Sequence, residues 1–145
     1  TLVCAVARSD MAIIGNIGDS RAYHITPEGI FQISRDHSVV ENMVAKGDLT
    51  PLEARTHPNR NLITRALGPD IHAKADTFEL PWHKDEFLLL CSDGLVNTVS
   101  DQAMLFEVLH DGDVNECLDH LLQISLQRGA PDNITAVLLL NGEGR

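Results

Sequence analysis

Short apolar runs bounded by turn-forming residues occur at both ends of the chain, and they predict β-strands. Some alternate apolar with polar residues, whereas residues 87–91 are apolar throughout and are typical of a buried central strand. The strands expected in this way cover residues 2–7, 11–17, 20–26, 30–33, 73–80, 87–91 and 134–140. Successive strands joined by short turns favour an antiparallel sheet.

Helical spacing appears between these strands. Apolar residues at i, i+3, i+4, i+7 and i+8 predict a core-facing helix that reaches Gln127. Asp113 and Glu116 have the spacing of a capping box at the start of this helix. Shorter helices are expected over residues 39–46, 51–55 and 101–109.

The order of these elements predicts the fold class. Strands come first, helices follow, and a strand closes the chain, with little alternation of strand and helix. This order favours an α+β fold in which helices pack on antiparallel sheet. We expect one domain over residues 1–145, in which residues 36–67 form a helical, loop-rich insertion.

The composition narrows the possible partners. The chain has 145 residues, of which 43% are hydrophobic, and 11 basic against 21 acidic residues give a net charge of −10. Nucleic acids and anionic membranes need a cationic surface, so neither is expected as a partner, whereas an acidic excess suits cation binding. No apolar stretch is long enough to span a membrane.

The cysteines bear on the cellular compartment of the protein, and the first residues bear on whether the chain is part of a longer one. Cys4, Cys91 and Cys117 each lie in an apolar run, and we expect them to be reduced core residues of a cytoplasmic protein. Thr1 opens the chain inside an expected strand, without an initiator Met. We therefore expect the chain to be part of a longer protein.

Three aspartates are the candidates for chemistry. Asp93 follows the strand over residues 87–91, Asp132 precedes the last strand, and Asp19 lies in the turn between two early strands. If the strands are antiparallel, these carboxylates meet at one edge of a sheet. Oxygen ligands of this kind favour Mg²⁺ or Mn²⁺, and Gly94 would allow the close backbone approach that an ion site needs.

The same residues also have an ordinary interpretation. Asp-Gly and Asp-Asn are common turn dipeptides, and an Asp beside a strand is frequent. The seven histidines are scattered and show no paired metal-ligand spacing, so structural roles are expected for most of them. The residues alone therefore lead to a candidate oxygen-ligand metal site and no further.

Five stretches of the sequence together resemble the metal-dependent Ser/Thr protein phosphatases of the PPM (type 2C) family, in their bacterial form. They occur in the family's order over nearly the whole chain, at residues 15–23, 35–38, 57–68, 90–95 and 131–135. The resemblance implies a layered sandwich of two antiparallel β-sheets flanked by helices, with a metal cluster at one edge. Residues 36–67 resemble the family's flap region, which lies beside the active site and influences substrate choice.

The resemblance also assigns roles to the three aspartates. It makes Asp93 and Asp132 ligands of a catalytic two-metal centre of Mn²⁺ or Mg²⁺, and it associates Asp19 with a third, more weakly held ion. Asn97 stands where many members carry an Asp that shares this third ion, and a neutral amide is a poorer ligand. The family's N-terminal third, with its phosphate-binding Arg and the Asp that bridges the metals, has no counterpart in this chain.

The leading hypothesis is therefore the C-terminal portion of a protein Ser/Thr phosphatase. It implies phosphorylated protein substrates, such as those of a Ser/Thr kinase, and little activity for this chain alone. The alternative is a degenerate phosphatase-like module that binds or regulates without catalysis, and a third reading is an unrelated α+β domain with coincidental turns. Because strands would be missing, exposed sheet edges are expected to favour self-association.

Overall fold

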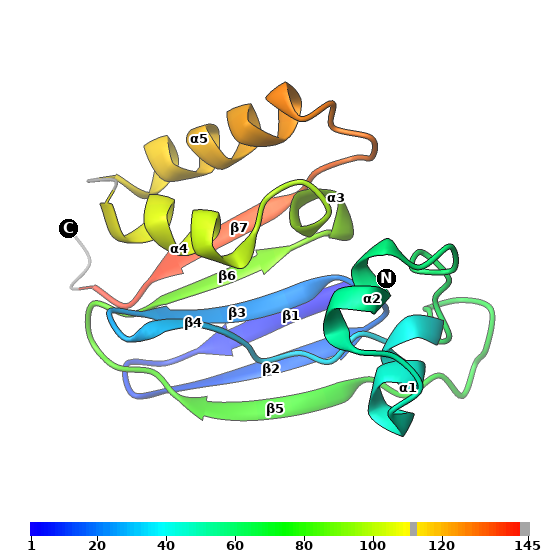
Figure 1. The fold of residues 1–145 in the computed structure, drawn as a ribbon. Helices are drawn as coiled ribbons and strands as arrows, with labels where there is room; N and C mark the ends of the chain where they lie inside the picture. Colours follow the sequence, from blue (N-terminus) through cyan, green and yellow to red (C-terminus); the bar gives the residue numbers. More distant parts are fainter. Residues whose placement is uncertain (111–112, 143–145) are drawn as a thin grey trace.

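Two antiparallel sheets lie face to face in the computed structural model, which describes residues 1–110 and 113–142 (Figure 1). The first sheet has the strand order β1-β2-β5, and the second has the order β4-β3-β6-β7. The strands of the first sheet are β1 (Leu2–Ala7), β2 (Met11–Ile17) and β5 (Asp76–Pro81). Those of the second are β3 (Arg21–Thr26), β4 (Gly29–Gln32), β6 (Phe87–Cys91) and β7 (Ala136–Leu140). The expected α+β class and the layered sandwich are confirmed.

Strand β6 is apolar throughout because both of its faces are covered. Leu88 faces the core between the two sheets, where it packs with Ile14 and Trp82, whereas Leu89 faces the opposite core beneath the helices. Both leucines are fully buried. Burial of each such side chain contributes about 1.5–3 kcal/mol to folding. Strand β6 lies between β3 and β7, and both hydrophobic cores pack on it.

Three helices cover the outer face of the second sheet or lead into that layer (Figure 1). They are α3 (Asp93–Val96), α4 (Asp101–His110) and α5 (Val114–Gln127). Met104 of α4 and Leu121 of α5 are buried against Leu89 and its neighbours. The apolar stripe that predicts α5 is therefore its core-facing side.

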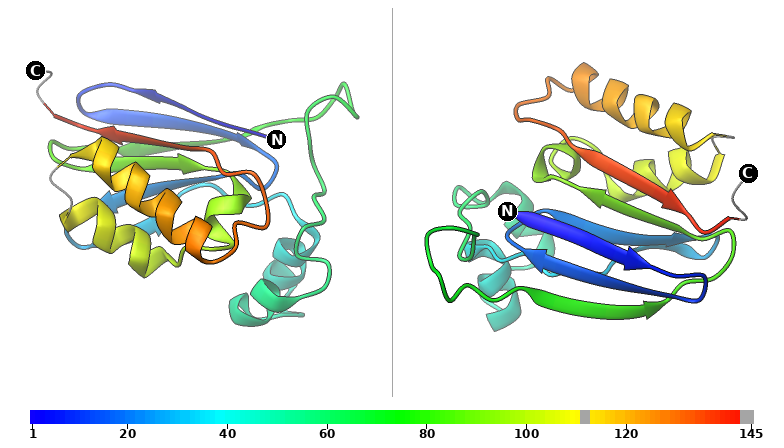
Figure 2. Two further views of the ribbon diagram at one scale, coloured as in Figure 1. Left: turned by 90° about the horizontal axis from the view of Figure 1, so that it is seen from above. Right: turned by 180° about the vertical axis from the view of Figure 1, so that it is seen from behind.

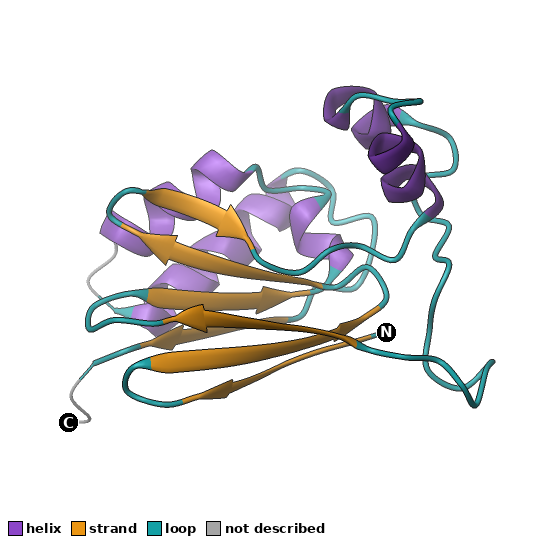
Figure 3. Ribbon diagram, turned by 90° about the horizontal axis from the view of Figure 1, so that it is seen from below, coloured by secondary structure: helices purple, strands orange, loops and turns teal. Residues whose placement is uncertain are grey.

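Two further helices form the insertion, beyond the ends of the strands (Figures 2 and 3). They are α1 (Val39–Lys46) and α2 (Pro51–Thr56). Ser38 caps α1 by accepting a hydrogen bond from the Glu41 N–H, and Thr50 and Glu53 form a capping box at the start of α2. In α2 no residue is buried, so local capping rather than a core defines this segment.

Several boundaries differ from those expected. Strand β5 begins at Asp76 rather than at residue 73, because Asp76 pairs with Asn16 and its partner strand β2 ends one residue later. Strand β7 begins at Ala136 rather than at residue 134, since it pairs there with Cys91, the last residue of β6. The short helix α3 was not expected from the sequence, because four residues are too few for a periodic pattern.

Two smaller predictions also need correction. Asp113 caps α5 through a 2.7 Å hydrogen bond from the Asn115 N–H, and no capping box with Glu116 is formed. Cys91 and Cys117 are buried as expected, but Cys4 is exposed. Cys4 lies on β1, which is an edge strand of its sheet, and no helix of the described residues covers the outer face of this strand (Figure 2).

Candidate active site

The antiparallel pairing of β6 with β7 brings the first two candidate aspartates together. Cys91 pairs with Ala136 at the end of this ladder, and Ser92 extends the pairing by one step. The Ser92 N–H donates to the Thr135 carbonyl oxygen at 2.9 Å, and the Thr135 N–H donates to Ser92 Oγ at 3.0 Å. Asp93 and Asp132 follow and precede this clasp, so they lie at the same end of the second sheet.

Gly94 makes the two segments approach closely. It is buried at the start of α3, and a β carbon at this position would overlap with the carbonyl oxygen of Asn133. Ser92 Oγ donates to the same carbonyl oxygen at 3.3 Å. The expectation that Gly94 permits close backbone approach is confirmed.

The carboxylates at this edge affect one another electrostatically. Burial and, next, the charge of Asp132 raise the pKa of Asp93. Burial and the charge of Asp93 in turn raise the pKa of Asp19, which lies in the turn between β2 and β3. Carboxylates that disfavour one another's ionised form are relieved by a cation between them. The structure therefore places the three aspartates near enough to one edge to affect one another's pKa values, while their role as metal ligands stays a prediction.

The described residues do not by themselves form a metal-binding cluster. Within residues 1–110 and 113–142, no three His, Cys, Asp or Glu side chains are grouped closely enough to hold a metal ion. The donor set still fits a hard divalent cation, because Asp93 and Asp132 offer carboxylate oxygens that repel each other when no cation is bound. Asn97 ends α3 and its side chain is exposed, one turn after Asp93.

A fourth carboxylate belongs to the same edge and was not predicted as a site residue. The negative charge of Asp36 raises the pKa values of both Asp19 and Asp93. Arg21 binds Asp36 through two nitrogens, with Nε 3.0 Å from Oδ1 and Nη2 2.8 Å from Oδ2. Arg21 also donates to the Tyr23 hydroxyl at 3.0 Å, which fixes the guanidinium plane.

Both members of this pair lie in motif stretches, at residues 15–23 and 35–38, but 15 positions separate them. No local spacing connects residues that far apart, so the sequence offered no signal for their contact. Arg21 is a half-buried cation next to the acidic edge, and it holds Asp36 in place there.

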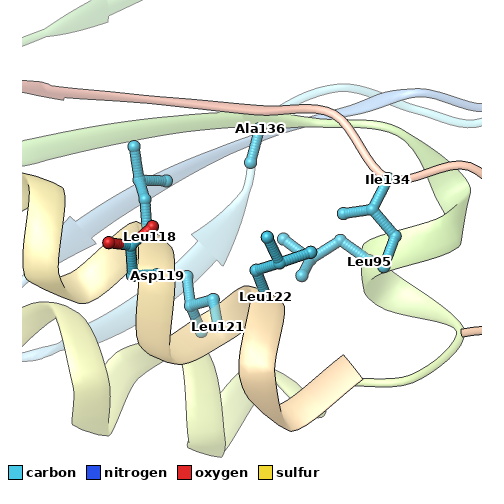
Figure 4. A pocket seen from close by; sticks show the side chains of 7 residues that line it. All are labelled: Leu95, Leu118, Asp119, Leu121, Leu122, Ile134 and Ala136. Carbon is cyan, nitrogen blue, oxygen red and sulfur yellow. The ribbon is translucent and has the colours of Figure 1, made fainter. Parts of the chain in front are cut away.

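An apolar pocket lies behind this edge, between α3, α5 and β7 (Figure 4). Its volume is about 150 Å³, and it is lined by Leu95, Leu118, Asp119, Leu121, Leu122, Ile134 and Ala136. Asp119 is the one charged residue of this lining. The pocket therefore lacks the oxygen ligands of the acidic edge and is separate from the candidate metal site.

The comparisons with known proteins agree with this arrangement. The family profile described as protein phosphatase 2C matches residues 1–138. The serine/threonine phosphatase stp of Listeria welshimeri is 34% identical over 139 residues, which cover 96% of this chain and 55% of that protein.

Solved structures are similar over the same range. The serine/threonine phosphatase Stp1 of Staphylococcus aureus superposes with a TM-score of 0.91 at 40% identity, over 95% of this chain and 54% of that one. The catalytic domain of the phosphatase PstP, solved in complex with two manganese ions, superposes with a TM-score of 0.81 at 32% identity, over 94% and 56%.

The match extends over almost the whole chain but not over the whole relatives. The chain spans about half the length of the phosphatases it resembles. A coincidental likeness of turns is excluded, because sequence and three-dimensional fold agree over 95% of the chain. This chain belongs to the protein phosphatase 2C family.

Proposed function

We propose that the full-length protein is a protein Ser/Thr phosphatase that hydrolyses phosphoserine and phosphothreonine in protein substrates. The observation that carries this proposal is the clasp between Ser92 and Thr135, which holds Asp93 and Asp132 at one edge of the sheet. The relatives of matching sequence and fold are named serine/threonine phosphatases.

The proposed cofactor is Mn²⁺ or Mg²⁺, in a two-metal centre to which this chain contributes Asp93 and Asp132. Such ions supply an acidified water and neutralise charge on a phosphoryl group. Asp93 and Asp132 would hold the cations, and Asp19 would serve a third position, which Asn97 weakens. Support comes from the mutual repulsion of these carboxylates and from the manganese complex of the relative PstP.

The reaction is tested by phosphate release from matched peptides. The full-length protein should hydrolyse phosphoserine and phosphothreonine peptides with Mn²⁺ or Mg²⁺, should lose this activity in excess EDTA, and should regain it when the metal is restored. Equal rates with and without a divalent cation, or hydrolysis confined to phosphotyrosine, would contradict the proposal.

A second candidate is a phosphatase-like module that binds phosphorylated segments without turning them over. Asn97 favours it, because this position lacks the carboxylate that a third cation would use. Tight binding of a phosphopeptide by the full-length protein, with no release of phosphate at any metal concentration, would support the module over the enzyme.

The proposed substrates are proteins that a Ser/Thr kinase has phosphorylated.

We also propose that the 145-residue chain by itself self-associates. Strand β1 is a sheet edge, and its outward side chains Leu2 and Val6 are 47% and 65% exposed. Exposed apolar edge strands favour pairing with another copy. Light scattering of this chain should give a mass above that of the 15.9 kDa monomer, and a monomer would contradict self-association.

We also infer a cytoplasmic location, because Cys91 is a free thiol buried in the core. Across the described part of the chain, the helices are all too short or too polar to cross a membrane. Cell fractionation of the full-length protein tests the location.

A further inference from the structure

His37 is a buried histidine whose two ring nitrogens both form hydrogen bonds, and none of the roles above uses it. Its side chain is 6% exposed, in the segment between β4 and α1. It lies one position after Asp36, which belongs to the acidic edge. The two ring nitrogens contact groups from two different parts of the molecule, the turn after β2 and the first residue of β5.

One ring nitrogen binds the turn that carries Asp19. The Gly18 N–H donates to His37 Nδ1 at 3.0 Å, and the His37 N–H donates back to the Gly18 carbonyl oxygen at 2.9 Å. Asn16 Nδ2 adds a longer bond of 3.4 Å to the same oxygen. Gly18 has a φ of 110°, a conformation that a larger residue rarely adopts, so this backbone is held in an unusual shape directly before Asp19.

The other ring nitrogen points to the segment that follows the insertion. Because the Gly18 N–H is a donor, Nδ1 carries the lone pair and the ring proton lies on Nε2. His37 Nε2 donates to Asp76 Oδ2 at 2.9 Å. Asp76 Oδ1 accepts from Arg65 Nη1 at 2.7 Å, and these hydrogen bonds, from His37 and then Arg65, lower the pKa of Asp76.

Main-chain hydrogen bonds connect the residues around His37 to the end of the insertion itself. The Thr64 N–H donates to the His37 carbonyl oxygen at 2.8 Å, and the Val39 N–H donates to the Leu62 carbonyl oxygen at 2.9 Å. His37 therefore contacts both the turn before Asp19 and the stretch that ends the insertion.

We propose that His37 and Asp76 are positioning residues that hold the Asp19 turn and the end of the insertion, residues 62–65, in one fixed arrangement. This inference rests on the proposed function, because its consequence is a correctly placed third-cation ligand beside a correctly placed end of the flap-like insertion. The Nδ1 bond positions the turn, and the Nε2 bond positions the end of the insertion through Asp76 and Arg65.

The two halves of this connection can be separated in the full-length protein. In His37→Asn, the side-chain oxygen takes the place of Nδ1 and keeps the Gly18 bond, while the Asp76 bond is lost. In His37→Gln, the side-chain NH₂ takes the place of Nε2 and keeps the Asp76 bond, while the Gly18 bond is lost. His83→Ala is the control, because His83 also contacts a carboxylate, that of Glu86, but at the opposite end of β6.

Three readouts decide the proposal: hydrogen exchange of the Gly18 amide, Mn²⁺ binding by calorimetry, and KM against kcat for a phosphothreonine peptide. His37→Gln should speed exchange of the Gly18 amide at least tenfold and weaken the weakest Mn²⁺ step about fivefold or more. His37→Asn should keep both within about twofold of the wild type but raise KM several-fold with a smaller change in kcat. His83→Ala should leave all three readouts unchanged.

Equal effects of His37→Asn and His37→Gln on every readout, in proportion to their loss of thermal stability, would overturn the positioning role. So would wild-type values in both variants. If the wild-type protein hydrolyses no phosphopeptide, the proposed function fails, whereas amide exchange and Mn²⁺ binding still decide whether His37 positions the Asp19 turn.

Discussion

The α carbon of Gly94 packs directly against the carbonyl oxygen of Asn133, so that no side chain fits between the segments that carry Asp93 and Asp132. Gly94→Ala should therefore force these segments apart. The expected loss of stability is about 1–3 kcal/mol, the usual range for overpacking, together with weaker Mn²⁺ binding. Thermal unfolding and calorimetry measure the two effects.

Gly142→Ala is the matched control for this substitution. A β carbon at position 142 would meet Leu140 at 3.6 Å, an ordinary contact distance. Wild-type metal affinity in Gly94→Ala would show that close approach at this point does not hold the two aspartates together.

Asp93→Ala in the full-length protein should abolish turnover and weaken metal binding. Loss of one electrostatic group at a reacting centre typically lowers kcat by about 10²–10³-fold, and the loss of a shared cation adds to this. Asp119→Ala is the control, because that carboxylate lines the apolar pocket behind the site. Unchanged hydrolysis of a phosphopeptide by Asp93→Ala would contradict the assignment.

Asp93→Asn should raise thermal stability when no metal is present. Burial and Asp132 raise the pKa of Asp93 above its ordinary 3.8, so the folded state binds this proton more tightly than the unfolded state does. Stability is then lost as pH rises from about 3.8 through the folded pKa, and the neutral amide escapes this loss. At pH 7 in EDTA, Asp93→Asn should therefore unfold at a higher Tm than the wild type, as measured by thermal unfolding.

Asp119→Asn is the control in the same thermal-unfolding experiments, and it should leave Tm unchanged. A lower Tm for Asp93→Asn than for the wild type in EDTA would mean that a favourable contact, and not repulsion, dominates at position 93.

Glu86→Gln should destabilise the opposite end of the sandwich in a pH-dependent way. Burial alone would raise the pKa of Glu86. Hydrogen bonds from the His83 N–H and the His24 side chain outweigh burial and leave this pKa below its ordinary 4.5. This contribution is present above pH 4.5 and is lost as pH falls through the folded pKa. We expect a loss of about 1–2 kcal/mol at pH 7 that shrinks below pH 4.

Denaturant titrations of the wild type and Glu86→Gln at pH 7 and below pH 4 measure this change in the free energy of unfolding. Glu79→Gln serves as the control, since Glu79 is exposed on β5. A pH-independent loss in Glu86→Gln would show that shape rather than charge matters at this position.

The 145-residue chain by itself should be a very poor phosphatase. Within residues 1–110 and 113–142, no three potential ligands are grouped around one ion position, so the carboxylates there would supply only part of a metal shell. Phosphate release from a phosphothreonine peptide should be lower than that of the full-length protein by several orders of magnitude at equal Mn²⁺. Comparable rates would show that this chain holds a complete active site.

Local sequence patterns determined most of the secondary structure. The strand over residues 87–91 and the helix α1 have the bounds expected, because hydrophobic spacing and capping residues act within a few positions. The positions of Asp93 and Asp132 at two strand ends also predicted their meeting, since antiparallel neighbours place the end of one strand beside the start of the next.

Only the tertiary structure decided which distant side chains pair. Arg21 meets Asp36, and His37 meets Asp76 across 39 positions, because the register of the sheets and the path of the insertion bring these segments together. Likewise, Cys4 has a core-like sequence neighbourhood but lies exposed, because it is on the outer face of β1, opposite Val3 and Ala5, which pack on the core. Periodicity reports which face of an element is apolar, whereas contacts between elements depend on how the layers are stacked, and no local pattern encodes that.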